Sequence, residues 1–263
     1  ATGGVPRSRL VAPELGRFAS HDGLEVPYFR FGPAEAPTVV WVHGGPESQF
    51  RPELNPVVQL LAAEGLTVVA PNIRGSTGYG RTYTSLDDVE LRHDANADLA
   101  ALARHLGAER GVPIGVMGGS YGGYATLAAL VGEPDLWRAG VDIVGIASLV
   151  TFLERTGAYR RALREAEYGS LEDDRDVLEA LSPLTRVDRI TAPLLVIHGA
   201  NDPRVPVGEA EQIVAALRGR GRVVEYLRYE DEGHGLVRLP NRIEAYGRVA
   251  AFLGRHLLGR DGG

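Results

Sequence analysis

Short apolar runs rich in valine and isoleucine alternate with longer segments of helical periodicity along most of the sequence. This alternation is typical of an α/β protein, in which crossover helices flank a mostly parallel sheet. Most of the runs are unbroken, as expected for strands that are buried on both faces. The predicted strands are residues 38–42, 67–70, 114–117, 141–144, 194–197 and 223–227, and the predicted helices are residues 55–64, 94–106, 121–131, 208–218 and 242–257.

The length and composition favour one globular domain. The chain has 263 residues, of which 44% are hydrophobic and 24% are charged, so a large buried core is expected. We expect residues 1–37 to form a lead-in that holds the first strands, and residues 38–263 to form the main α/β domain. No internal repeat or low-complexity linker interrupts this organisation.

Charge and cysteine content restrict the partners. A net charge of −6 gives no general attraction to nucleic acid phosphates or anionic lipid, so we expect neither nucleic acid nor membrane as a partner. The absence of cysteine excludes disulfides and a cysteine nucleophile, and it favours a cytoplasmic location. No stretch approaches the roughly 18 apolar residues that a membrane span requires.

Residues 148–189 depart from the alternating pattern. They are rich in Arg, Glu and Asp and hold Phe152, Tyr159 and Tyr168 at irregular spacing. We predict a small helical excursion over the site. Its aromatic residues either belong to a solvated helical insertion or, with Val205, line a substrate pocket.

A glycine-rich turn between a predicted strand and a predicted helix carries a candidate nucleophile. The segment Gly118-Gly119-Ser120-Tyr121-Gly122-Gly123 contains the pattern G-x-S-x-G. In this context the pattern indicates a nucleophile elbow of the α/β-hydrolase fold, with the serine hydroxyl held above the sheet. The alternatives are a helix N-cap and a phosphate loop, but a phosphate loop would need a G-K-[ST] sequence, which is absent.

The acid and the base of this fold follow the nucleophile in the order acid, then histidine. Asp202 lies in a turn just after the predicted strand 194–197, and His234 lies in a glycine-flanked loop before the last helix. A histidine is required because a serine hydroxyl is a poor nucleophile until a base accepts its proton, and a carboxylate orients that base. Asp231 is a rival acid, but it is only three residues before His234.

An oxyanion hole is expected beside the serine. The strand 38–42 runs into His43-Gly44-Gly45-Pro46, where this fold supplies one backbone donor, and Tyr121 after the nucleophile supplies the other. A plain turn is the alternative. No H-E-x-x-H motif occurs, and we expect neither a metal nor another cofactor.

Taken together, these motifs resemble the catalytic domain of the prolyl oligopeptidase family of serine peptidases, nearest to its acylaminoacyl peptidase and dipeptidyl aminopeptidase-like branch. The matching segments follow the family's order along nearly the whole chain: PEL and FASHDGL near the start, HGGP from His43, NIRGSTGYG from Asn72, GGSYGG from Gly118, HGANDPRVP from His198, and EGHG from Glu232.

The resemblance implies catalytic roles for Ser120, Asp202 and His234 and oxyanion donors at the backbone of Gly45 and Tyr121. It also implies a role near the site for residues 74–80, where Arg74 and Tyr79 either bind substrate or form a salt bridge and a packing contact. Family members usually carry an N-terminal β-propeller, for which the sequence before the first hydrolase strand is too short. Either the propeller is missing from a longer chain, or this is a free-standing enzyme.

The leading functional hypothesis is a serine hydrolase that cleaves small peptide, amide and carboxylic ester bonds through an acyl-enzyme intermediate. Its expected partner is a small peptide or ester substrate, and a homo-oligomer is left open. The alternatives are a carboxylesterase with little peptidase activity and, more remotely, a noncatalytic binding module, which would usually lack one member of the triad.

Overall fold

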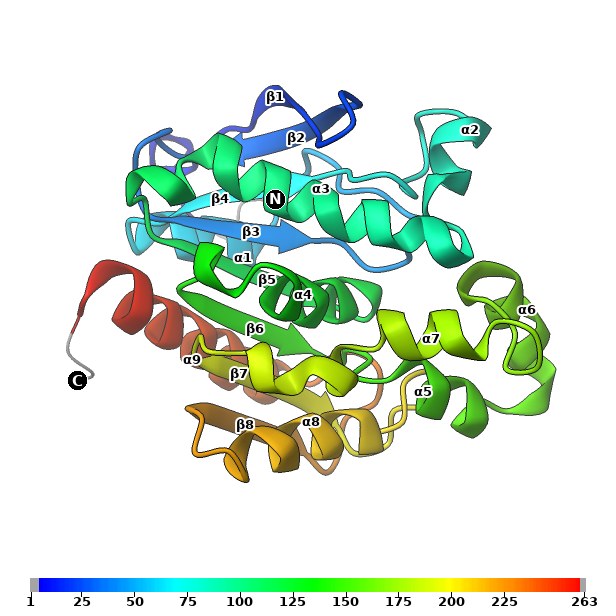
Figure 1. Ribbon diagram of the computed structural model, residues 1–263. Coiled ribbons are helices and arrows are strands. Elements are labelled where there is room, and N and C mark those ends of the chain that lie inside the picture. The colour runs from blue at the N-terminus through cyan, green and yellow to red at the C-terminus, as the bar shows by residue number, and fades with distance from the viewer. Residues whose placement is uncertain (1–4, 261–263) are drawn as a thin grey trace.

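The computed structural model describes residues 5–260, so residues 1–4 of the lead-in lie outside the described part. This part forms an eight-stranded sheet, and Figure 1 shows helices on both of its faces. In sheet order the strands are β1 (Glu14–Ala19), β2 (Glu25–Phe31), β4 (Thr67–Pro71), β3 (Thr38–Val42), β5 (Ile114–Gly119), β6 (Ala139–Ile143), β7 (Leu194–Gly199) and β8 (Val224–Tyr229).

The sheet is parallel from β4 to β8, and only the pairs β1–β2 and β2–β4 are antiparallel. The carboxyl ends of six strands therefore lie at one edge of the sheet, where open α/β sheets bind ligands. All six strands predicted from apolar runs are present. The expected strand 141–144 ends one residue early because Val144 has a φ of 48°, which does not continue a strand.

The helices form two layers. Buried side chains of α3, α4 and α8 share one apolar cluster with one face of the sheet, and those of α1 and α9 share a second cluster with the opposite face. The helices are α1 (Pro56–Ala63), α2 (Arg81–Thr84), α3 (Arg92–Leu106), α4 (Tyr121–Gly132), α5 (Leu149–Arg155), α6 (Ala158–Tyr168), α7 (Arg175–Leu181), α8 (Gly208–Arg218) and α9 (Leu239–Leu258). Among residues 5–260, none of these helices has the length and apolarity needed to cross a bilayer.

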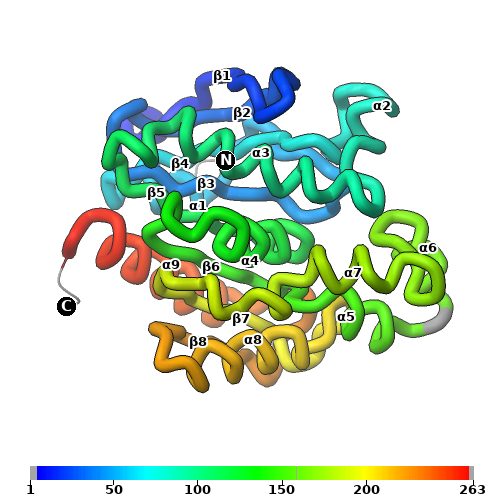
Figure 2. Tube along the Cα trace, in the orientation of Figure 1, coloured from blue at the N-terminus to red at the C-terminus, as the bar shows by residue number. Residues whose placement is uncertain are grey.

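The helical excursion is present as α5, α6 and α7. Figure 2 shows these helices together beyond the ends of β6 and β7, on the side toward which the strand arrows of Figure 1 point. Leu149, Phe152 and Leu178 are buried in the same apolar cluster as α3, α4 and α8. The excursion is therefore fixed to one side of the carboxyl edge.

Candidate active site

The turn from β5 into α4 holds Ser120 in a conformation that is rare for a non-glycine residue. Its φ is 59° and its ψ is −120°. A Cβ atom on Gly118 would lie 2.2 Å from the carbonyl oxygen of Gly122, and one on Gly122 would lie 2.2 Å from that of Val42. Both positions therefore exclude any side chain, which explains the G-x-S-x-G pattern in physical terms.

The side chain of Ser120 meets His234, which follows β8 in the loop before α9. Nε2 of His234 lies 3.0 Å from Oγ of Ser120, and Nδ1 lies 2.7 Å from Oδ2 of Asp202. A carboxylate can only accept, so Nδ1 carries the hydrogen and Nε2 is free to accept the serine proton. Three residues separated by up to 114 positions thus form one continuous hydrogen-bonded chain.

Asp202 is buried and held by the backbone of its own loop. Its Oδ1 accepts hydrogen bonds from the amides of Arg204 at 2.8 Å and Val205 at 2.9 Å. Burial raises the pKa of this carboxyl, but the hydrogen bonds from His234, Val205 and Arg204 outweigh burial and hold the pKa below its ordinary value. The carboxylate is ionised at neutral pH.

The rival carboxylate, Asp231, does not reach the histidine. Its side chain is half exposed, pairs with Arg238 at 3.1 Å, and accepts a hydrogen bond from Asn241 at 3.0 Å. The carboxylate that lies behind His234 is that of Asp202.

Two supporting residues were not predicted from the sequence. His198 is fully buried at the end of β7, and its Nε2 donates to the carbonyl of Val205 at 3.0 Å, which closes the loop that carries Asp202. Glu232 accepts from the amides of Val237 and Arg238, both at 2.9 Å, and so fixes the chain between His234 and α9. The only sequence signal for either residue is its place beside a triad member.

The loop after β3 lies against the elbow. A Cβ atom on Gly44 would lie 3.0 Å from the carbonyl oxygen of Gly119 and 3.5 Å from Cβ of Ser120, so a side chain here would crowd the elbow. His43 braces the loop: its Nδ1 donates to the carbonyl of Gly44 at 2.8 Å, and its Nε2 lies 2.9 Å from Oγ of Ser76. Burial lowers the pKa of His43, so its imidazole is neutral.

The two expected oxyanion donors are the backbone amides of the residue after Ser120 and of the residue after Gly44. Tyr121 is the first residue of α4, and the first amides of a helix have no partner within it. Gly45 follows Gly44 on the facing loop and has a φ of 139°, which is accessible mainly to glycine.

Arg74 is engaged in a buried ion cluster. Its Nη2 donates to Asp98 at 2.8 Å and to Asp22 at 3.0 Å, and its side chain is 3% exposed. These contacts correspond to the salt-bridge alternative. Tyr79 packs against Tyr83 and accepts a hydrogen bond from Asn72 at 2.7 Å, with part of its ring exposed.

The predicted pocket residues occupy different environments. Phe152 is buried and packs edge-on against Tyr168 with 5.8 Å between ring centroids, and Val205 is buried beside Asp202. Tyr159 is 81% exposed on α6 and has the surface of a solvent-facing residue. The structure therefore places Phe152 and Val205 in the protein interior and Tyr159 outside it.

A buried arginine near the elbow, Arg92, was also not predicted from the sequence. Arg92 is fully buried, pairs with Asp87 at 3.1 Å, and donates to the carbonyl of Glu167 at 3.0 Å. Its guanidinium lies 4.4 Å from the ring centroid of Tyr168 and 5.2 Å from that of Tyr121. Arg92 thus ties the end of α6 to the residue that follows Ser120.

A mostly parallel sheet flanked by helices, with a serine on a strained turn and a histidine and an aspartate from later loops in hydrogen-bond reach, defines a serine hydrolase of the α/β-hydrolase fold. The family follows from comparison with known proteins. The sequence profile of the prolyl oligopeptidase family matches residues 52–260, so the chain belongs to this family.

The similar proteins belong to the expected branch. Dipeptidyl aminopeptidase BIII of Pseudoxanthomonas mexicana is 40% identical over 236 residues, which are 86% of this chain and 34% of that protein. A crystal structure of puromycin hydrolase superposes with a TM-score of 0.90 at 28% identity, covering 98% of this chain and 41% of the other. The acylaminoacyl peptidase of Pyrococcus horikoshii gives a TM-score of 0.86 at 27% identity, covering 97% and 43%.

These comparisons confirm the predicted fold, family and branch. The chain spans about a third of the length of the curated relatives it matches.

Proposed function

We propose that the chain is the catalytic domain of an acyl hydrolase that cleaves small peptide, amide and carboxylic ester bonds through an acyl-enzyme on Ser120. The observation that carries this proposal is the unbroken chain from Asp202 through His234 to Ser120, with distances of 2.7 Å and 3.0 Å. Relatives that include an acylaminoacyl peptidase and a dipeptidyl aminopeptidase support small peptides as the substrate class.

Each residue of the triad has one role in this proposal. Nε2 of His234 removes the proton from Ser120 as the hydroxyl oxygen attacks the substrate carbonyl. The same nitrogen then gives this proton to the leaving amine or alcohol as the bond to the carbonyl carbon breaks. Asp202 stabilises the imidazolium between these steps, and a water molecule activated by His234 later releases the acyl group.

The negative charge that develops on the carbonyl oxygen needs donors that are already in place. The amides of Tyr121 and Gly45 are our candidates, because one begins α4 and the other lies on the loop in contact with the elbow. Removing one such donor costs about 10²- to 10³-fold in kcat in other serine hydrolases.

Esters belong to the proposed substrate range because an alcohol leaves more readily than an amine. A cytoplasmic location is also part of the proposal, since a chain without cysteine suits a reducing compartment. We also retain two predictions from the sequence: that a propeller domain accompanies this chain, and that the protein forms a homo-oligomer.

The test uses p-nitrophenyl butyrate and an N-acetyl-aminoacyl anilide. We expect turnover of both, and Ser120→Ala should abolish turnover together with labelling by a fluorophosphonate probe. Ser8→Ala, which changes an exposed serine of the lead-in, is the matched control and should behave as the wild type. A folded wild-type protein that turns over neither substrate and is not labelled would refute the proposal.

A further inference from the structure

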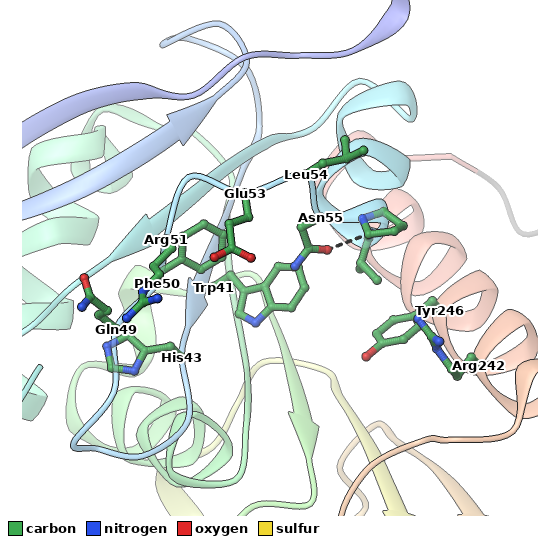
Figure 3. A pocket seen from close by; sticks show the side chains of 12 residues that line it. Trp41, His43, Gln49, Phe50, Arg51, Glu53, Leu54, Asn55, Arg242 and Tyr246 are labelled. Carbon is green, nitrogen blue, oxygen red and sulfur yellow. Dashed lines mark hydrogen bonds between the residues drawn. The ribbon is translucent and has the colours of Figure 1, made fainter. Parts of the chain in front are cut away.

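A cleft of about 410 Å³ opens on the α1 and α9 side of the sheet, next to the loop that follows β3. Its volume falls within the roughly 300–1,000 Å³ of typical small-molecule sites. Figure 3 shows the Trp41 indole between the loop that follows β3 and two residues of α9, Arg242 and Tyr246. The other lining residues all come from that loop and the start of α1.

Both walls of the cleft are tied to catalytic loops. On one side His43 lines the cleft, and the next residue, Gly44, lies so near the elbow that a Cβ atom on it would be 3.5 Å from Cβ of Ser120. On the other side α9 begins five residues after His234, and the carboxylate of Glu232 fixes the connection through the amides of Val237 and Arg238. The cleft is therefore connected to the reacting centre through the loop of His43 and through the start of α9.

The excursion and the cleft lie on opposite sides of the sheet. Side chains of α5 and α7 share the apolar cluster of α3 and α4, whereas Trp41, Phe50 and Tyr246 belong to the cluster of α1 and α9. A substrate bound across Ser120 at the carboxyl edge would therefore have one half toward the excursion and the other toward the cleft. We take the acyl half to lie on the side of the excursion, so the leaving half faces the cleft.

The cleft combines aromatic walls with free cations. Trp41, Phe50 and Tyr246 provide apolar surface, while Arg51 and Arg242 are exposed at its rim. Within the described part of the chain neither of these two arginines forms an ion pair. By contrast, Arg238 just before α9 pairs with Asp231, and Arg248 on α9 pairs with Glu225. Among residues 5–260, Glu53 is the one carboxylate that lines the cleft, so the described lining is net positive.

We propose that this cleft binds the leaving half of a peptide substrate, namely an amino acid or short peptide with an apolar side chain and a free α-carboxylate. The inference rests on the proposed function, because the cleft is placed by its relation to Ser120. The aromatic residues would receive the side chain, and the guanidinium of Arg242, assisted by Arg51, would receive the carboxylate through charge-assisted hydrogen bonds.

The test compares acetyl-Ala-Phe with acetyl-Ala-Phe-amide, which differ only in the terminal carboxylate. We expect the wild type to prefer the free carboxylate in kcat/KM. Arg242→Gln should lower the ratio of the two kcat/KM values about tenfold, and Arg51→Gln together with Arg242→Gln should remove the preference. The matched control is Arg248→Gln on the same helix, whose arginine pairs with Glu225 outside the cleft.

Failure of this inference is distinguishable from failure of the proposed function through p-nitrophenyl butyrate, which has no carboxylate. If the wild type hydrolyses this ester but shows no preference between the two peptides, or cleaves neither, the cleft assignment is overturned and the proposed function stands. An unchanged ratio in Arg242→Gln would also overturn it. If ester hydrolysis and fluorophosphonate labelling are both absent, the proposed function itself fails.

Discussion

Nδ1 of His234 lies 2.7 Å from Oδ2 of Asp202, while the neighbouring Asp231 points to Arg238 and Asn241 instead. Asp202→Asn would replace the acceptor by an amide and favour the wrong imidazole tautomer. We expect kcat to fall by about 10³- to 10⁴-fold with little loss of stability. Steady-state ester hydrolysis at pH 7 measures this effect. Asp231→Asn is the matched control, and loss of activity in that variant alone would contradict the assignment.

The hydrogen bond from His198 to the carbonyl of Val205 should be needed to keep the loop that carries Asp202 in its observed conformation. His198→Phe keeps an aromatic ring but leaves this buried carbonyl without its donor, which costs about 1–3 kcal/mol of unfolding free energy. Because Val205 also donates to Asp202, we expect a lower kcat as well. Urea unfolding and ester hydrolysis would check both effects. Wild-type values in both measurements would show that the contact is dispensable.

Glycine at position 122 should be indispensable for steric reasons. Gly122→Ala places a methyl group 2.2 Å from the carbonyl oxygen of Val42, so the elbow must shift, and we expect either loss of activity or failure to fold. Gly247→Ala is the control: this helical position in α9 has nothing within 4 Å, and alanine there should stabilise the protein by about 0.5–1 kcal/mol. Thermal unfolding and activity of the two variants distinguish packing from a general effect of alanine.

Asp142 on β6 should make the protein less stable as the pH rises. Burial raises the pKa of its carboxyl from 3.8 to about 7, so the folded state binds more protons than the unfolded state between these values. Its stabilising contribution is fully present below pH 3.8 and is lost as the pH rises through 7. At 1.36 kcal/mol per unit, the loss approaches about 4 kcal/mol.

Asp142→Asn isolates this contribution, because the amide stays neutral at every pH. Urea unfolding at pH 5 and pH 8 should show a smaller decrease for Asp142→Asn than for the wild type. Asp87 and Glu167, whose pKa values burial raises to about 6 and about 7, contribute in the same direction and remain in both proteins. An equal decrease in the two proteins would exclude Asp142 as a cause.

The parallel part of the sheet could be predicted from the sequence because five of its six strands are mostly buried and have apolar sequences. Boundaries were less accurate where the backbone rather than the side chain decides, as at Val144 with its positive φ. The excursion could be located, but the bounds of α5, α6 and α7 could not be predicted. The aromatic residues of this segment are irregularly spaced, so no clear helical periodicity marks each helix.

The positions of Ser120, Asp202 and His234 could be predicted because glycine patterns and chain order mark them. Arg92 and His198 could not, because their roles depend on contacts with residues far along the chain or on a backbone carbonyl. Arg74 shows the converse: its motif suggested a substrate role, while its partners Asp22 and Asp98 lie 52 and 24 residues away. Local sequence patterns identify such residues but not their partners.

The backbone at Ser120 has a φ of 59°, and this conformation is fixed when the protein folds rather than when a substrate binds. Packing of β5, α4 and the Gly44 loop holds the hydroxyl in position before a substrate binds. The serine is therefore preorganised for attack on the substrate carbonyl. Changes elsewhere in the chain that loosen this packing would consequently slow turnover without touching any reacting atom.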